Sequence, residues 1–139
     1  MTNPEPVRIL IIDDNPADVM LAEECIKDTG INVVITSIDD GEKAIEFFNG
    51  LGEHLEERPD LVLIDLNLPK RNGHEILESI RLHDGQTKVI VYSGSKSPED
   101  LKKAKSEGVE GYLVKPMTLE EIEATVVQLR QILTSCRIG

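Results

Sequence analysis

The sequence has few aromatic residues. Its 139 residues include two Phe, two Tyr and no Trp, and none of these side chains lies within a basic segment. Proteins that bind single-stranded nucleic acid stack bases on aromatic side chains inside a positively charged groove. The chain instead carries 26 acidic and 15 basic residues, a formal net charge of −11, which opposes binding to nucleic acids and anionic lipids. The composition therefore predicts no nucleic acid and no membrane as a partner.

Cysteine and long apolar runs are also scarce. Cys25 and Cys136 form no CxxC pair and no cluster with His54, His74 or His83 at zinc-site spacing. We expect Cys25 to be a buried thiol and Cys136 to be a free thiol in the tail. No segment has the pattern of a signal peptide, and no apolar run approaches the roughly 20 residues that span a bilayer. These absences predict a soluble, cytoplasmic protein.

Five short apolar runs alternate with amphipathic segments. Runs that are apolar on both faces are typical of parallel strands covered by helices on both sides. Strict alternation predicts an α/β fold, a doubly wound parallel sheet of five βα units with right-handed crossovers. We expect one domain over residues 1–139, with a core at about 7–134 and a short C-terminal tail. The expected strands are 7–12, 33–35, 61–64, 89–92 and 112–114.

Capping residues mark the intervening helices. Ser, Thr, Asp and Asn accept hydrogen bonds from the first N–H groups of a helix, and glycine often ends one. We expect Leu101 and Ala104 to anchor the fourth helix, and positions 119, 122, 126, 129 and 133 to form one apolar stripe on the last. The expected starts are Asn15-Pro16, Asp39 or Asp40, Asn72-Gly73, Ser97-Pro98 and Thr118, and the expected ends include Gly30 and Gly108.

Polar residues follow four of the five expected strands. The carboxyl ends of parallel strands meet at one edge of the sheet, where open α/β sheets bind their ligands. Three carboxylates gathered there would repel one another, and a set of oxygen ligands suits Mg²⁺. The residues concerned are Asp13 and Asp14 after the first strand, Asp65 after the third, Ser93 after the fourth and Lys115 after the fifth.

These groups are equipped for phosphoryl transfer. Lys115 supplies a point charge suited to phosphate, Ser93 supplies a hydroxyl, and a carboxylate beside Mg²⁺ can attack phosphorus to form an aspartyl phosphate. Asp65 is the best candidate nucleophile because it stands alone on a central strand. Each residue taken singly is also compatible with a helix cap or an ordinary loop position. Their joint occurrence, in order, at the ends of the strands favours the functional interpretation.

The sequence resembles the response-regulator receiver domain of two-component signalling over residues 7 to about 134. The resemblance rests on the segments ILIIDDNPAD, DLVLIDLNLPKRNG, VIVYSGS and GYLVKPM. It implies a flavodoxin-like (βα)5 fold with the strand order 2-1-3-4-5. The loop after the second helix and the segment LNLPKRNG are most similar to single-domain receivers that partner phytochrome-type sensor kinases.

The resemblance implies a phosphoacceptor and a metal site. Asp65 would accept the phosphoryl group. Asp13, Asp14, Asp65 and the backbone carbonyl of Asn67 would bind Mg²⁺ or Mn²⁺. Lys115 would pair with a phosphoryl oxygen.

The resemblance also implies a switch. Ser93 would be the hydroxyl that reaches for the phosphoryl group, and Tyr112 would be the aromatic residue that turns inward on phosphorylation. Lys115 would be joined to Pro116 by a cis peptide bond, which is otherwise a minority state.

A protein of this family signals and is not expected to be an enzyme beyond its own phosphoryl transfer and slow dephosphorylation. A sensor histidine kinase or phosphotransfer protein would be the partner that phosphorylates it. No effector module follows the last expected helix, so a stand-alone response regulator would bind a downstream protein in trans. The face of the fourth helix, fifth strand and fifth helix would carry this signal, and a homodimer through the same face is a hypothesis.

Two alternative functions remain open. One is a hydrolase of the haloacid dehalogenase type. It is disfavoured because such enzymes carry their nucleophile in an Asp-x-Asp motif on the first strand, whereas here Asp13 and Asp14 are adjacent and the lone Asp65 follows the third strand. The other is a receiver that scaffolds partners without being phosphorylated, which the intact set of polar residues disfavours.

Overall fold

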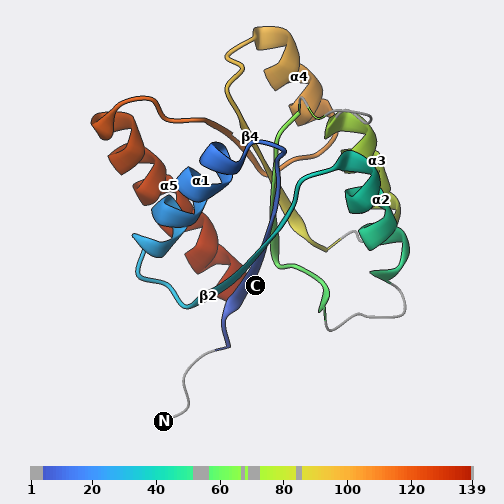
Figure 1. The fold of residues 1–139 in the computed structure, drawn as a ribbon, viewed down its shortest axis with the longest axis horizontal. Helices are drawn as coiled ribbons and strands as arrows, with labels where there is room; N and C mark the ends of the chain where they lie inside the picture. Colours follow the sequence, from blue (N-terminus) through green and yellow to red (C-terminus); the bar gives the residue numbers. More distant parts are fainter. Residues whose placement is uncertain (1–4, 52–56, 67, 69–72, 84–85, 139) are drawn as a thin grey trace.

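The computed structural model describes residues 5–51, 57–66, 68, 73–83 and 86–138. Strands and helices alternate along the whole described chain (Figure 1). The elements are β1 (Val7–Ile12), α1 (Pro16–Lys27), β2 (Val33–Ile38), α2 (Gly41–Asn49), β3 (Leu61–Ile64), α3 (Gly73–His83), β4 (Lys88–Ser93), α4 (Pro98–Ser106), β5 (Gly111–Val114) and α5 (Leu119–Ile138).

The five strands form one parallel sheet in the order β2-β1-β3-β4-β5. The register places Ile12 of β1 beside both Ile38 of β2 and Ile64 of β3, and it places Ser93 of β4 beside Val114 of β5. The strands therefore end close together at one edge of the sheet. This arrangement confirms the predicted fold class and strand order.

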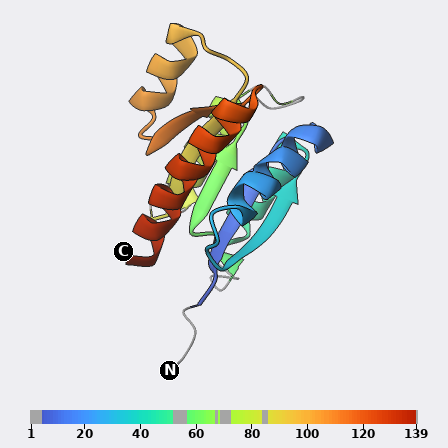
Figure 2. The same cartoon turned by 90° about the vertical axis from the view of Figure 1, so that its left-hand side faces the viewer.

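Helices cover both faces of the sheet. Helices α1 and α5 lie side by side on one face, and α2 and α3 cover the other (Figures 1 and 2). Alternate residues of β1 divide between the two cores: Leu10 and Ile12 pack under α2 and α3, whereas Ile9 and Ile11 pack under α1 and α5. Buried apolar surface on both faces is what a near-continuous hydrophobic strand requires.

The outer elements are less buried than the sequence pattern predicts. Strand β2 is at the edge of the sheet, and Val34 is 43% exposed. Leu119 is the first residue of α5 and is 72% exposed, so it does not join the apolar stripe. In α4 the predicted anchor Leu101 is 37% exposed, and Ala104 is the buried residue. Helix α4 is thus held by fewer buried contacts than expected.

Most predicted helix boundaries are confirmed. Asn15, Asp40 and Ser97 are the N-caps of α1, α2 and α4. Gly30 and Gly108 follow α1 and α4 with the positive φ angles of 76° and 81° that glycine adopts without strain. Asn72 lies outside the described residues.

Both cysteines are free thiols. Cys25 is buried, as predicted, whereas Cys136 is half-buried within α5 and does not lie in a tail beyond it. No helix in the described part of the chain is both long enough and apolar enough to cross a membrane.

Candidate functional site

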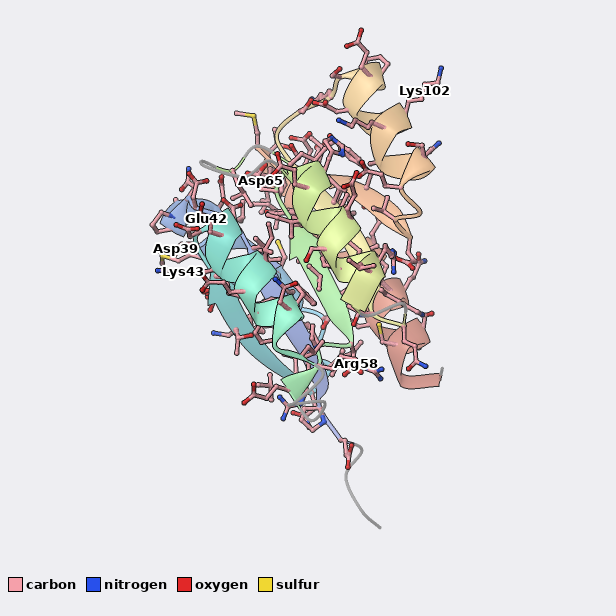
Figure 3. All side chains as sticks on the ribbon, turned by 90° about the vertical axis from the view of Figure 1, so that its right-hand side faces the viewer. Asp39, Glu42, Lys43, Arg58, Asp65 and Lys102 are labelled. Atoms are coloured by element: carbon pink, nitrogen blue, oxygen red, sulfur yellow. The ribbon has the colours of Figure 1, made fainter. Side chains whose placement is uncertain are left out.

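Two buried aspartates stand side by side where β1 and β3 end. The backbone N–H of Asp65 donates a hydrogen bond to the carbonyl of Ile12 (3.0 Å), and the N–H of Asp13 donates one to the carbonyl of Ile38 (3.1 Å). Asp13 is 2% exposed and Asp65 is 8% exposed, whereas Asp14 faces solvent. Oxygen atoms of the three carboxylates lie within 4.8 Å of one another. Figure 3 shows Asp65 at this end of the sheet, with Arg58 at the opposite end.

Lys115 brings its ammonium group to this cluster from the end of β5. Its backbone N–H donates to the carbonyl of Ser93 (2.9 Å), which fixes where the side chain begins. Its Nζ lies 2.9 Å from Asp13 Oδ2, 2.8 Å from Asp65 Oδ2 and 2.8 Å from Asp18 Oδ2. The structure thus places one half-buried cation among three carboxylates, which follow β1 and β3 or lie in the first turn of α1.

Burial and these ion pairs shift two pKa values in the site. Burial raises the pKa of Asp13, and the Lys115 ammonium and the N–H of Asn15 offset part of that rise. Burial alone would lower the pKa of Lys115, but its hydrogen bonds to the three aspartates outweigh this effect and raise the pKa above its usual value. Lys115 therefore remains charged.

The carboxylate cluster fits a divalent cation. Asp13 Oδ2 is buried and pairs with the Lys115 ammonium at 2.9 Å, with no further hydrogen-bond donor in the described structure. Burying a carboxylate oxygen carries a desolvation cost that a metal ion beside it reduces. Three carboxylates offering only oxygen match the preference of Mg²⁺ and Mn²⁺. Asn67, the fourth predicted ligand, lies outside the described residues.

Ser93 and Tyr112 are joined through the loop between β4 and α4. The side chain of Ser93 is fully buried, and its Oγ accepts a hydrogen bond from the N–H of Ser95 (3.1 Å). The hydroxyl of Tyr112 donates to the carbonyl of Ser95 (2.9 Å), and the Tyr112 ring packs against the core beneath α2 and α3. The hydroxyl of Ser95 in turn donates to Asp100 of α4 (2.8 Å).

Two features of the site differ from the sequence prediction. The described residues contain no cis peptide bond, so the predicted cis bond between Lys115 and Pro116 is wrong. The Lys115 ammonium reaches its three carboxylates with that bond trans, and trans is the lower-energy isomer of an X–Pro bond. Asp18 was missed as a site residue because an acidic residue in the first turn of a helix is explained by the helix dipole alone.

Gly73, the first residue of α3, packs closely against the backbone of Asp65 and Leu66. Its N–H donates to the carbonyl of Leu66 (2.8 Å). A Cβ added at Gly73 would lie 2.5 Å from Leu66 Cα and 2.8 Å from the carbonyl oxygen of Asp65. The first residue of α3 must therefore be glycine if the backbone after β3 is to keep this position.

Comparison with known proteins identifies the family. Residues 9–127 match the model of the response regulator receiver domain. The chain is 34% identical to the probable methanogenesis regulatory protein FilR2 of Methanothrix harundinacea, over 91% of this chain and 83% of that protein. It is 33% identical to the response regulator Rcp1 of Synechocystis, over 87% of this chain and 84% of that protein. The chain belongs to the response-regulator receiver family.

Other relatives are longer. The chain is 37% identical to the nitrate/nitrite response regulator NarL of Escherichia coli, over 88% of this chain but only 54% of NarL. This likeness therefore concerns about half of that protein.

Solved structures agree with this assignment. The phosphorylated cyanobacterial phytochrome response regulator RcpA matches with a TM-score of 0.80 and 28% identity, over 94% of this chain and 96% of that chain. The Mn²⁺-bound form of Rcp1 matches with a TM-score of 0.74 and 31% identity, over 91% of each chain. Together with the cluster of Asp13, Asp14 and Asp65, the latter indicates a divalent metal site.

Proposed function

We propose that this protein is a response regulator that accepts a phosphoryl group on Asp65 from a partner histidine kinase or phosphotransfer protein. The observation that carries the proposal is the position of the Lys115 ammonium, 2.8 Å from Asp65 Oδ2 and 2.9 Å from Asp13 Oδ2. An ammonium held in this position stabilises the negative charge that develops on a transferred phosphoryl group.

Asp13, Asp14 and Asp65 hold the divalent cation, Mg²⁺ or Mn²⁺, with the carbonyl of Asn67 as the further ligand that the family resemblance implies. When bound, the cation supplies positive charge next to the oxygens of the transferred group. Asp13 and Asp65 are largely buried, and this limits competition from water for the same oxygens.

The transfer itself uses Asp65 and Lys115. A carboxylate oxygen of Asp65 attacks phosphorus of the donor phosphohistidine. The new O–P bond forms as the P–N bond breaks, and the imidazole leaves with the electron pair of that bond. Lys115 then pairs with an oxygen of the phosphoryl group, because its ammonium already contacts Asp65.

The switch uses the loop after β4. The Oγ of Ser93 accepts a hydrogen bond from the N–H of Ser95, so a Ser93 side chain that turns to donate to the phosphoryl group pulls on Ser95. Ser95 also accepts the hydrogen bond of Tyr112 and donates to Asp100 of α4. A shift of Ser95 therefore reaches both the Tyr112 ring and α4, whose small buried surface makes rearrangement inexpensive.

The rearranged α4–β5–α5 face carries the signal to a protein bound in trans, and a homodimer through the same face is part of the proposal. The likeness to RcpA, a cyanobacterial phytochrome response regulator, supports a phytochrome-type kinase as the partner. We further propose that residues 1–139 act as one receiver unit in the cytoplasm, without enzymatic activity toward other substrates. The span of the match to Rcp1, 84% of that protein, supports the single unit.

The proposal is tested by incubating the protein with acetyl phosphate and Mg²⁺. We expect one base-labile phosphoryl adduct on the wild type, no adduct on Asp65→Asn, and none when EDTA removes the cation. The proposal fails if the wild type gains no adduct or if Asp65→Asn gains as much as the wild type. Rapid turnover of phosphate esters would indicate a hydrolase instead.

A further inference from the structure

Asp18 contacts the site but takes no part in the proposed phosphoryl transfer. It lies in the first turn of α1, and its Oδ2 is 2.8 Å from Lys115 Nζ, across 97 residues of chain. The Asp18 side chain is 29% exposed and that of Lys115 is 13% exposed. The contact is therefore partly shielded from water and is stronger than a surface ion pair.

Helix capping does not explain this position. In a capping box, the Glu or Gln three positions after the cap accepts a hydrogen bond from the N–H of the cap residue. Here the N–H of Asn15 donates to Asp13 Oδ1 (2.9 Å), so that capping position is taken. The carboxylate of Asp18 is turned to Lys115 instead.

Asp18 also stands apart from the metal cluster. Among the three carboxylates that contact Lys115 in the described structure, Asp13 and Asp65 are in the cluster that fits a divalent cation, and Asp18 is not. A cation on Asp13 and Asp65 competes with Lys115 for those two residues. Asp18 is then the carboxylate that keeps its ion pair with the ammonium.

Tyr92 limits where the ammonium can go. The Nζ of Lys115 lies 5.7 Å from the centre of the Tyr92 ring, a distance at which cation and ring attract. The ring is 2% exposed and forms a fixed wall within the core beneath α1 and α5. The ammonium is thus bounded by Tyr92, by the metal cluster and by Asp18.

We propose that Asp18 is a positioning residue that holds the Lys115 ammonium on the α1 side and so allows a divalent cation to bind beside it. Without the charge of Asp18, the ammonium is drawn fully onto Asp13 and Asp65 and opposes the incoming cation. The inference rests on the metal site of the proposed function, but it is tested by metal affinity and does not require phosphorylation.

The experiment measures the affinity for Mg²⁺ and Mn²⁺ by calorimetric titration. Asp18→Asn keeps the shape of the side chain and removes its charge. We expect it to weaken the affinity about tenfold, the lower end of what groups behind metal ligands contribute. Glu24→Gln, at an exposed position of the same helix, removes one negative charge away from Lys115. We expect this control to change the affinity less than twofold, because salt screens the effect of a distant exposed charge.

A double-mutant cycle with Lys115→Met tests whether Asp18 acts through the ammonium. We expect Asp18→Asn to change the affinity about twofold or less in the Lys115→Met background, because the competing cation is gone. An equal loss in both backgrounds, or no loss in the wild-type background, would overturn the inference and leave the proposed function standing. If the wild type itself binds neither cation, the proposed function fails and the inference fails with it.

Thermal melts in EDTA separate this role from a merely structural one. A contact that only fastens α1 to β5 would lower the melting temperature without changing metal affinity, and that outcome would also overturn the inference. If Asp18→Asn folds poorly, Asp18→Ser gives the same comparison, because serine suits the first turn of a helix and carries no charge.

Discussion

The hydroxyl of Tyr112 donates a hydrogen bond to the backbone carbonyl of Ser95 at 2.9 Å. The N–H of the same Ser95 donates to Ser93 Oγ at 3.1 Å. Three residues from β4, β5 and the loop before α4 are thus joined in one chain of hydrogen bonds. The arrangement couples the buried end of β4 to the aromatic residue predicted to be the switch.

Tyr112→Phe should loosen this loop. The variant loses one half-buried hydrogen bond, and we expect the free energy of unfolding to fall by about 1 kcal/mol in urea titration. Amide hydrogen exchange of residues 94–97 should quicken. Tyr92→Phe is the matched control, because the buried Tyr92 hydroxyl has no hydrogen-bond partner in the described structure and its removal should cost nothing. Equal losses in the two variants would refute the role of the Ser95 contact.

Asp13→Asn should stabilise the protein in EDTA. Burial raises the pKa of Asp13, so ionisation at neutral pH costs the folded state free energy, and this cost is relieved as the pH falls. The variant removes that cost, and its amide oxygen can still accept a hydrogen bond from the backbone N–H of Asn15. Lys115 keeps its ion pairs with Asp18 and Asp65. We expect a gain in the free energy of unfolding at pH 7 that shrinks in acid, measured by urea titration at several pH values. Adding Mg²⁺ should stabilise the wild type but not the variant, and an equal response to Mg²⁺ would contradict the metal assignment.

Gly73→Ala should destabilise the fold and displace the backbone at Asp65. The added Cβ would lie within 3 Å of the backbone of Asp65 and Leu66, which cannot move without displacing the end of β3. We expect a loss of about 2 kcal/mol or more in denaturant unfolding, together with weaker binding of Mg²⁺. Gly94→Ala has open space around its added Cβ and should leave stability nearly unchanged. Similar losses at the two glycines would show that the close approach at Gly73 is unimportant.

Neither cysteine should react readily in the folded protein. Burial, with Asp28 and Glu24 nearby, raises the pKa of Cys25, and burial raises that of Cys136 despite Lys88. A raised pKa lowers the thiolate fraction at pH 7 and moves the onset of reaction to higher pH. In Cys136→Ser, we expect Cys25 to react with an aromatic disulfide reagent only after unfolding. Fast reaction of the native variant at pH 7 would contradict the structure.

The parts of the fold that follow from local pattern were predictable. Strands β1 and β3 have the predicted bounds, because a continuous run of branched apolar residues suits a strand buried on both faces. Local pattern does not say which strand lies at the edge. Only the strand order that the family resemblance implies places β2 there, where Val34 is exposed. Leu119 keeps the helical spacing of the stripe, but as the first residue of α5 it is exposed, and spacing alone does not show where along a helix burial begins.

The candidate site was predictable only where strand ends determine it. Asp13, Asp65, Ser93 and Lys115 were expected at one edge because parallel strands bring their carboxyl ends together. Asp18 comes from the first turn of a helix, and nothing in its local sequence indicates a contact with Lys115. The same holds for Tyr92, whose sequence context indicates only a buried strand residue.

The central claim is that the phosphoryl group resides on Asp65. The most direct test treats the protein with acetyl phosphate and Mg²⁺, reduces any acyl phosphate with borohydride, and locates the resulting homoserine by tandem mass spectrometry. We expect homoserine at position 65 alone, and only when the divalent cation is present. Homoserine at position 13 or 14 with position 65 unmodified, or no homoserine at all, would contradict it.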